Sequence, residues 1–338
     1  MAYSTIPKGS LYMNPKIYTG TGSSNAITGV GFQPDWTWIK RRNGTNGHNL
    51  YDVIRGVTKT INSATTAAES TSGSGLTAFG TDGFTVVSDG DVNASGGTYA
   101  SWNWLANGTG SANTAGSINS TVSANTTSGF SIVSYTGNGG STPKTVGHGL
   151  GVAPKMIIIK PRNLAYDWMI YNENVGATKG MCLNTTQAPF TSSNFNDTAP
   201  TTSVFSVKNN ATNETNGTYI AYCFADVQGF SKMGSYTGNA NANGPFVYTG
   251  FKPSFVIIKR TNLANDWLTQ DNKRYPINET VAKTLKPNSA LAEGDTGNLD
   301  ILSNGFKLRS TGTNTNASGG TYIYMAFAEN PFVATSGT

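Results

Sequence analysis

The sequence predicts an all-β protein: three tandem, diverged β-sandwich or jelly-roll-like units behind a short extended N-terminal arm. Charged residues make up 12% of the 338 residues, and the chain contains 40 Gly. Soluble proteins usually carry roughly twice that share of charge. Asn, Thr, Ser and Gly favour turns and weaken helix interiors, because their side chains or bare backbones compete with helical hydrogen bonds. No long window has helical periodicity, and one ordered set of motifs recurs three times.

The first half of each unit contains a Tyr-Thr-Gly motif, then a glycine-containing turn closed by proline, then a strand that ends in lysine. The β-branched and aromatic residues of these strands suit a buried, pleated position. Two of the strands are apolar up to the lysine, so we expect both of their faces to be covered. Proline should mark the beginning of each strand, because it lacks a ladder donor. In chain order, the motifs are Tyr18–Gly20, Tyr135–Gly137 and Tyr236–Gly238; Gly31–Pro34, Gly149–Pro154 and Gly250–Pro253; and Trp36–Lys40, Met156–Lys160 and Phe255–Lys259.

The second half of each unit contains an alternating strand and a closing turn that ends in Gly-Thr-Tyr. The lysines at the strand ends are 120 and 99 residues apart, and the closing tyrosines are 120 and 103 residues apart. Two independent landmarks therefore give nearly the same period. The strands and closing motifs are Asp82–Val86, Ser203–Val207 and Asn304–Leu308, and Asn93–Tyr99, Asn213–Tyr219 and Asn316–Tyr322.

These motifs divide the chain into an arm, three units and one linker. The Gly- and Ser-rich linker is expected to be flexible and to lead into a strand. The second and third units follow one another directly, so we expect them to pack together as one body, with the first unit tethered. The predicted bounds are 1–15 for the arm, 16–107 for the first unit, 108–128 for the linker, 129–229 for the second unit and 230–338 for the third.

No set of residues indicates catalysis or a cofactor. His48 and His148 fall at non-equivalent places and are expected to be exposed loop residues, and no ligands have zinc spacing. The Asp167-Trp168 and Asp266-Trp267 pairs recur at equivalent positions, which favours a structural role over the paired carboxylates of a glycan-cleaving enzyme. We therefore predict no catalytic, cofactor-binding or metal-binding residues, and no cofactor.

Several weaker signals have two interpretations. The oxygen-rich loops 88–93 and 295–300 could hold calcium, but ordinary turns are favoured. Cys182 and Cys223 are either buried thiols or a single bridge. The cluster Lys40–Arg42 is interpreted as a strand end with its charges in water rather than as a nucleic-acid contact.

Aromatic side chains beside many Asn and Thr residues would permit carbohydrate binding. Four tryptophans lie at strand alternation and are instead expected in the core, namely Trp36, Trp38, Trp102 and Trp104. The sequence has no phosphate-binding loop, no signal peptide and no apolar stretch of membrane-spanning length. We expect a soluble protein that binds no nucleic acid and does not insert into a membrane.

Three segments carry a resemblance to a known family, namely Gly31–Lys40, Val146–Lys155 and Asn304–Arg309. Through these segments the chain resembles tail-fibre-like or uncharacterised virion proteins of tailed phages that infect marine bacteria. The resemblance covers nearly the whole chain. The resemblance implies a non-enzymatic structural protein of the tail apparatus, located in the virion and assembled in the host bacterial cytoplasm. It also implies that the arm docks on another virion subunit and that the protein forms homo-oligomers, with a trimer expected.

The expected role is attachment to a host-surface glycan or protein. A capsid-decorating or head-fibre protein would have the same sequence features, and a glycan-binding or glycan-cleaving tailspike module is a second alternative. We expect attachment to the virion at the first unit and its arm, and outward recognition at the second and third units.

Overall fold

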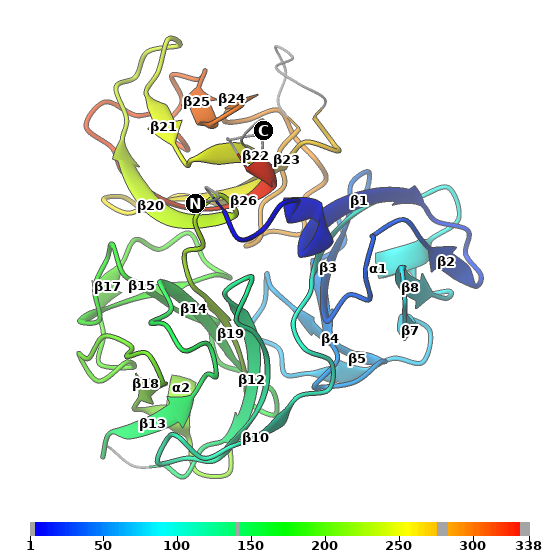
Figure 1. Cartoon of the computed structure of the whole chain (residues 1–338). Coiled ribbons are helices and arrows are strands. Elements are labelled where there is room, and N and C mark those ends of the chain that lie inside the picture. Colours follow the sequence, from blue (N-terminus) through cyan, green and yellow to red (C-terminus); the bar gives the residue numbers. More distant parts are fainter. Residues whose placement is uncertain (1–3, 140–141, 276–282, 332–338) are drawn as a thin grey trace, which may run out of the picture.

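The computed structural model describes residues 4–139, 142–275 and 283–331. Antiparallel strands dominate this part of the chain, and its helices are short: η1 (Gly9–Leu11), α1 (Gly90–Asn93) and α2 (Asn210–Asn213). The all-β prediction is confirmed. Three sheet-containing lobes surround a common centre (Figure 1).

Each lobe has a main sheet and a small sheet. The first main sheet has the order β1 (Met13–Thr19), β9 (Thr98–Trp104), β3 (Trp36–Arg41), β4 (Asn49–Asp52), β5 (Lys59–Asn62) and β6 (Ser70–Thr71). The first small sheet has the order β2 (Asn25–Ile27), β8 (Gly83–Val86) and β7 (Leu76–Gly80).

The second main sheet has the most strands. Its order is β10 (Ser111–Asn113), β11 (Ser120–Asn125), β12 (Phe130–Thr136), β19 (Thr218–Phe224), β14 (Met156–Pro161), β15 (Met169–Asn172), β16 (Lys179–Cys182) and β17 (Phe190–Thr191). The second small sheet pairs β13 (Lys144–Gly147) with β18 (Val204–Val207).

The third lobe follows the same plan with fewer strands. Its main sheet has the order β20 (Ser231–Thr237), β26 (Thr321–Pro331), β22 (Phe251–Arg260) and β23 (Trp267–Asp271). Its small sheet has the order β21 (Phe246–Tyr248), β25 (Gly305–Leu308) and β24 (Leu299–Leu302).

Both faces of the lysine-ended strands are buried, as the sequence predicts. Every residue of β14 is buried, and so is Trp36–Lys40 in β3. Two of these strands begin just after their proline, whereas Pro253 lies inside β22. The pairing register shifts on both sides of Pro253, so this proline occupies a β-bulge, where a missing donor is tolerated.

The two most distinctive motifs of each unit are partners in space. In every main sheet the tyrosine of Tyr-Thr-Gly pairs in register with the closing tyrosine, and the two rings stack with centroids 4.9–5.0 Å apart. The pairs are Tyr18 with Tyr99, Tyr135 with Tyr219, and Tyr236 with Tyr322.

A buried asparagine holds each of these motif pairs together. Asn93 Oδ1 accepts from the Thr21 amide at 3.0 Å, and Asn213 and Asn316 accept from the amides of Asn138 and Asn239 in the same way. The asparagines are at most 1% exposed. The threefold repetition stays an interpretation of the sequence, and these matching positions support it.

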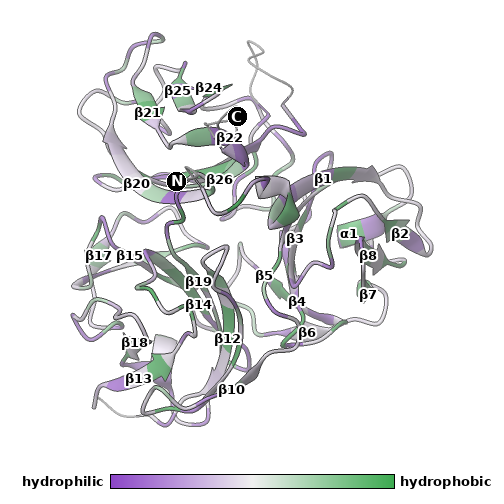
Figure 2. Cartoon of the chain, viewed as in Figure 1, coloured by the Kyte–Doolittle hydropathy of each residue, from purple (hydrophilic) through white to green (hydrophobic). Residues whose placement is uncertain are grey.

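One hydrophobic core spans all three lobes. Its centre is an aromatic triad of Trp104, Phe224 and Phe327, which lie on the closing strands β9, β19 and β26. Their ring centroids lie 6.4, 5.7 and 5.9 Å apart, and each side chain is at most 1% exposed. Figure 2 shows hydrophobic strands such as β12 and β19 facing this middle. The four tryptophans expected in the core are all there.

The first unit is not a tethered outlier. It supplies Trp36 and Trp104 to the shared core, and Trp36 stacks on Tyr222 of the second unit at 4.3 Å. The linker prediction also differs from the structure. Residues 111–113 and 120–125 form β10 and β11, and β11 pairs along its whole length with β12. Regular strand pairing satisfies backbone groups that a flexible linker would leave to water.

The described part of the N-terminal arm packs on this chain itself. Ile6 is fully buried, and Gly9 lies so close to β26 that a Cβ at this position would come within 2.2 Å of the Ala328 carbonyl oxygen. Glycine at position 9 therefore permits the arm to contact the third lobe. Residues 4–12 pack on the rest of the chain and do not form the extended arm that the sequence predicts.

Removing one ring of the triad should destabilise the whole chain. We expect Phe224→Ala to lower the free energy of unfolding by about 3–5 kcal/mol, because it removes packing and leaves a cavity. Urea unfolding followed by fluorescence measures this. Phe246→Ala is the matched control, since Phe246 is 45% exposed, and its change should stay within about 0.5 kcal/mol. Equal effects of the two variants would contradict a tightly packed centre.

Candidate functional site

The contacts between neighbouring units, here called seams, hold most of the buried charge. At the seam between the first and second units, Arg55 pairs with Asp52 and lies 3.4 Å from Glu69. Arg162 of the second unit donates two hydrogen bonds of 3.0 Å to Glu69. The Tyr222 hydroxyl donates to Asp52 Oδ2 at 2.8 Å. A connected series of ion pairs, from Asp52 through Arg55 and Glu69 to Arg162, therefore joins the first and second units.

The seam between the third and first units repeats this arrangement. Arg274 pairs with Asp271 at 2.5 Å and with Glu293 at 3.0 Å, and Arg42 of the first unit reaches Glu293 at 2.9 Å. The Trp102 indole donates to Asp271 Oδ2 at 2.9 Å. Both seams that involve the first unit therefore contain a connected series of ion pairs.

The seam between the second and third units lacks this chain of charges. Asn172 and Val175 stand where the other two seams have Asp and Arg. Hydrogen bonds without a carboxylate connect these units instead. Trp267 Nε1 donates to the Cys182 carbonyl at 2.9 Å, and the Asn265 amide and the Lys259 amine donate to the Thr186 carbonyl at 2.7 and 2.8 Å. The three units therefore contact one another in a closed cycle. The sequence predicted that the second and third units pack together. It did not predict that the first unit is joined to both of them by ion pairs.

Asp271 owes its ionised state to its partners. Burial by itself would raise the pKa of Asp271, but Arg274, its backbone amide and the Trp102 indole lower the pKa below its usual value. A lowered pKa contributes stability above the unfolded value of about 3.9, and this contribution is lost as the pH falls through the native pKa.

Neutralising Asp271 should therefore be costly. We expect Asp271→Asn to lower the free energy of unfolding by about 3–5 kcal/mol near neutral pH, because it leaves Arg274 buried without its charge partner. The difference from the wild type should shrink below about pH 4. Urea unfolding at several pH values measures both. Asp300→Asn is the control, since Asp300 pairs with Arg309 near the surface; a similar loss in this variant would contradict the assignment.

The three lysines that end the central strands are buried, so the prediction of charged tips in water is wrong for Lys40. Lys40, Lys160 and Lys259 are fully buried, and burial lowers the pKa of each to about 8. Their amines donate to backbone carbonyls of the loop that follows each strand. Lys160 also donates to Thr66 across its seam, and Lys259 to Thr186.

Lys160 is expected to contribute to the seam through these hydrogen bonds. Lys160→Met keeps the apolar stem but leaves the carbonyls of Thr66, Pro161 and Leu164 without this donor. We expect a loss of about 1–3 kcal/mol in the free energy of unfolding. Lys155→Met, which breaks the exposed pair with Glu173, should cost at most about 1 kcal/mol. Thermal and urea unfolding compare the two variants, and an unchanged Lys160→Met would exclude this role.

Both histidines are buried, contrary to the prediction of exposed loops. His48 Nδ1 accepts from the Trp38 indole at 2.8 Å, and His148 Nδ1 accepts from the Leu150 amide at 3.2 Å. Burial lowers the pKa of both side chains. His48 is eight residues beyond Lys40, the position where Lys160 and Lys259 are followed by Trp168 and Trp267. His48 therefore occupies the position at which the other two units have a tryptophan whose indole donates across a seam.

The other candidate residues have structural partners. Cys182 and Cys223 are free, buried thiols, and burial raises the pKa of Cys182 to about 12. Asp167 accepts from Asn184, and Asp266 from Asn288 and Lys286. In the loop 88–93, Asp89 caps α1, and Asp295 and Asp300 pair with Lys283 and Arg309. Over the described ranges, no group of His, Cys, Asp and Glu could hold a metal ion.

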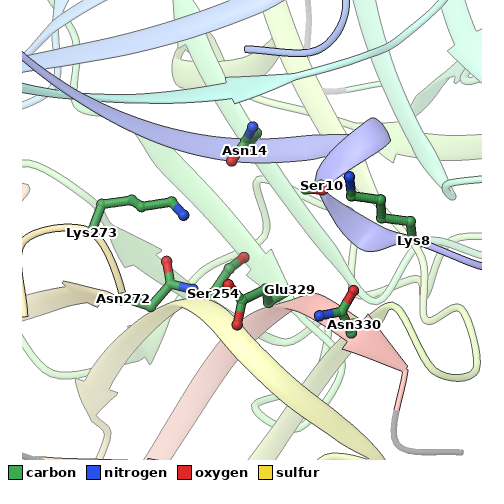
Figure 3. Close-up of a pocket in the computed structure, with 8 residues that line it drawn as sticks. All are labelled: Lys8, Ser10, Asn14, Ser254, Asn272, Lys273, Glu329 and Asn330. Carbon is green, nitrogen blue, oxygen red and sulfur yellow. The ribbon is translucent and has the colours of Figure 1, made fainter. Parts of the chain in front are cut away.

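A polar cavity lies between the N-terminal segment and the third lobe. It has a volume of about 240 Å³, below the roughly 300 Å³ at which sites for larger ligands begin. Figure 3 shows side chains from η1, β1, β22 and β26 around it. The lining residues are Lys8, Ser10, Asn14, Ser254, Asn272, Lys273, Glu329 and Asn330.

The cavity suits a small polar or anionic group rather than a reaction. Glu329 is the single carboxylate among its lining residues, and Lys252 pairs with it at 2.7 Å. Ser254 donates to the Phe327 carbonyl at 3.3 Å and has no base beside it among its bonded partners. Glycoside hydrolysis needs a second carboxylate and acyl transfer needs an activated nucleophile. The sequence motifs gave no signal for this cavity, because its residues come together only in the folded chain.

The fold and these sites define an all-β protein of antiparallel sheets in which two ion pairs, Arg42 with Glu293 and Arg162 with Glu69, join neighbouring units. Residues 8–331 match the family described as Domain of unknown function (DUF7483), and the chain belongs to this family. A search of the curated proteins found no match to the chain. Within the residues that the structure describes, no helix is long and apolar enough to cross a membrane.

Proposed function

We propose that this protein is a non-enzymatic structural protein of a bacteriophage virion, in the tail apparatus as part of a fibre or tip, where it contributes to attachment to the host surface. The observation that carries the proposal is the closed cycle of three lobes around one aromatic centre. Such a body keeps its shape, because each lobe is packed and bonded to both of the others.

The distribution of polar residues supports this role. The charged residues of the seams are bonded to one another, while the loops between strands are rich in Asn, Ser, Thr and Gly. Neutral polar loops on a rigid β scaffold are a common arrangement for recognition. The resemblance to virion proteins of tailed phages points the same way. Under this proposal the protein is located in the virion and is assembled in the host bacterial cytoplasm.

The proposed partners are other virion subunits, further copies of this chain and a host-surface molecule. A homotrimer is the proposed assembly, in line with the symmetric oligomers that such proteins form. Its units already close their core within one chain, so a trimer would associate through outer surfaces. Light scattering on the purified protein measures the assembly.

Immunogold electron microscopy of phage particles that contain this protein tests the location. We expect gold on the tail, and gold confined to the head would favour the capsid-decorating or head-fibre alternative. Incubating the purified protein with polysaccharide from the host envelope tests the absence of enzymatic activity. Polysaccharide of unchanged length is expected, and shortened chains would overturn the non-enzymatic assignment.

A further inference from the structure

The third lobe exposes two aromatic rings side by side. Phe246 and Tyr248 of β21 are 45% and 49% exposed, while Val247 between them is 6% exposed. Alternate residues of a strand point to the same face, so the two aromatic side chains lie on one face about 7 Å apart along the strand. β21 is an edge strand on the outer part of this lobe (Figure 1).

The small sheet does not require aromatic residues at these positions. Its buried phenylalanine, Phe306, pairs with Val247, as Phe84 pairs with Ile27 and Phe205 with Val146. In this register, Phe246 corresponds to Ala26 and Thr145 in the other lobes, and Tyr248 corresponds to Thr28 and Gly147. The other two small sheets form without a ring at either position. The aromatic pair is therefore particular to the third lobe and is not explained by its core.

Polar groups of both signs surround the two rings. Lys307 is the cross-strand partner of Phe246, and the Lys232 amine lies 5.7 Å from the centre of the Tyr248 ring. Asp300 on β24 is the cross-strand neighbour of Lys307 on β25. Its carboxylate forms an ion pair of 3.1 Å with Arg309. The cross-strand partner of Tyr248 is Gly305, where a Cβ would come within 2.1 Å of the Val247 carbonyl oxygen. No side chain at position 305 therefore separates the rings.

We propose that this face of the third lobe, formed by Phe246, Tyr248, Lys232, Lys307 and Asp300, binds an oligosaccharide. The rings offer apolar surfaces on which sugar rings stack, and the lysines and the aspartate offer donors and acceptors for hydroxyl groups. The proposal extends the proposed function by naming the chemical class of the host-surface partner and the residues that contact it.

A glycan fits this face better than two other occupants. A stable protein interface buries roughly 800 Å² on each partner, which two half-exposed rings do not provide. A single-stranded nucleic acid would also stack on the rings, but it requires a positively charged groove that follows the phosphates. Here Asp300 and its ion pair with Arg309 interrupt the positive charge.

The test measures binding of the full chain to immobilised bacterial surface polysaccharides and their oligosaccharides, with the single-stranded oligonucleotide dT20 as a further probe. The double variant Phe246→Ala, Tyr248→Thr introduces the residues of the first lobe. We expect the wild type to bind at least one glycan and the double variant to bind it at least about tenfold more weakly, a change of about 1.4 kcal/mol. The melting temperatures of the two proteins should agree.

Leu263→Ala is the matched control, since Leu263 is 52% exposed but lies outside this face, and it should bind the glycan as the wild type does. Binding to no glycan, equal binding by the double variant, or binding of dT20 in place of any glycan would each overturn the proposal. None of these results bears on the position of the protein in a phage particle, so failure here is distinguishable from failure of the proposed tail location.

Discussion

The burial of both faces of the central strands in each main sheet governs the rest of this structure. One face packs on the shared aromatic centre, and the other packs under the small sheet of the same lobe. A strand covered on both sides has no solvent face on which to place charge, so its polar groups need partners inside the protein. Lys40, Lys160 and Lys259 meet this need at the strand ends by donating to backbone carbonyls. Without these bonds the central strands could not end in buried amines.

The seams fix how the three lobes meet. Buried ion pairs contribute little net stability when compared with apolar packing, yet breaking one is costly. Two seams contain an Asp-Arg-Glu-Arg series of ion pairs, and the third is joined by hydrogen bonds without a carboxylate, so the third seam differs from the other two.

Under the proposed function, the residues that hold the shape of this body differ from those that would bind a partner. Its titratable residues are largely committed to structure: the histidines accept hydrogen bonds in the interior, the thiols are buried, and the aspartates of the Asp-Trp pairs bond to asparagines. The features left for partners lie on the outside, in the polar cavity beside the N-terminal segment and in the aromatic face of β21. Both involve the third lobe, one of the two units to which we propose to assign outward recognition.

The sequence by itself determined the all-β class, the strands and the recurring motifs, because alternation, turn residues and motif order are local properties of the chain. It also placed Trp36, Trp38, Trp102 and Trp104 in the core. Only the tertiary structure decided that Tyr18 stacks on Tyr99, that residues 111–125 add strands rather than form a flexible linker, and that His48 and Lys40 are buried. These outcomes depend on which distant segments cover a residue. A histidine or lysine in a polar loop has the same local pattern whether water or a neighbouring lobe lies over it, so its burial could not be read from the sequence.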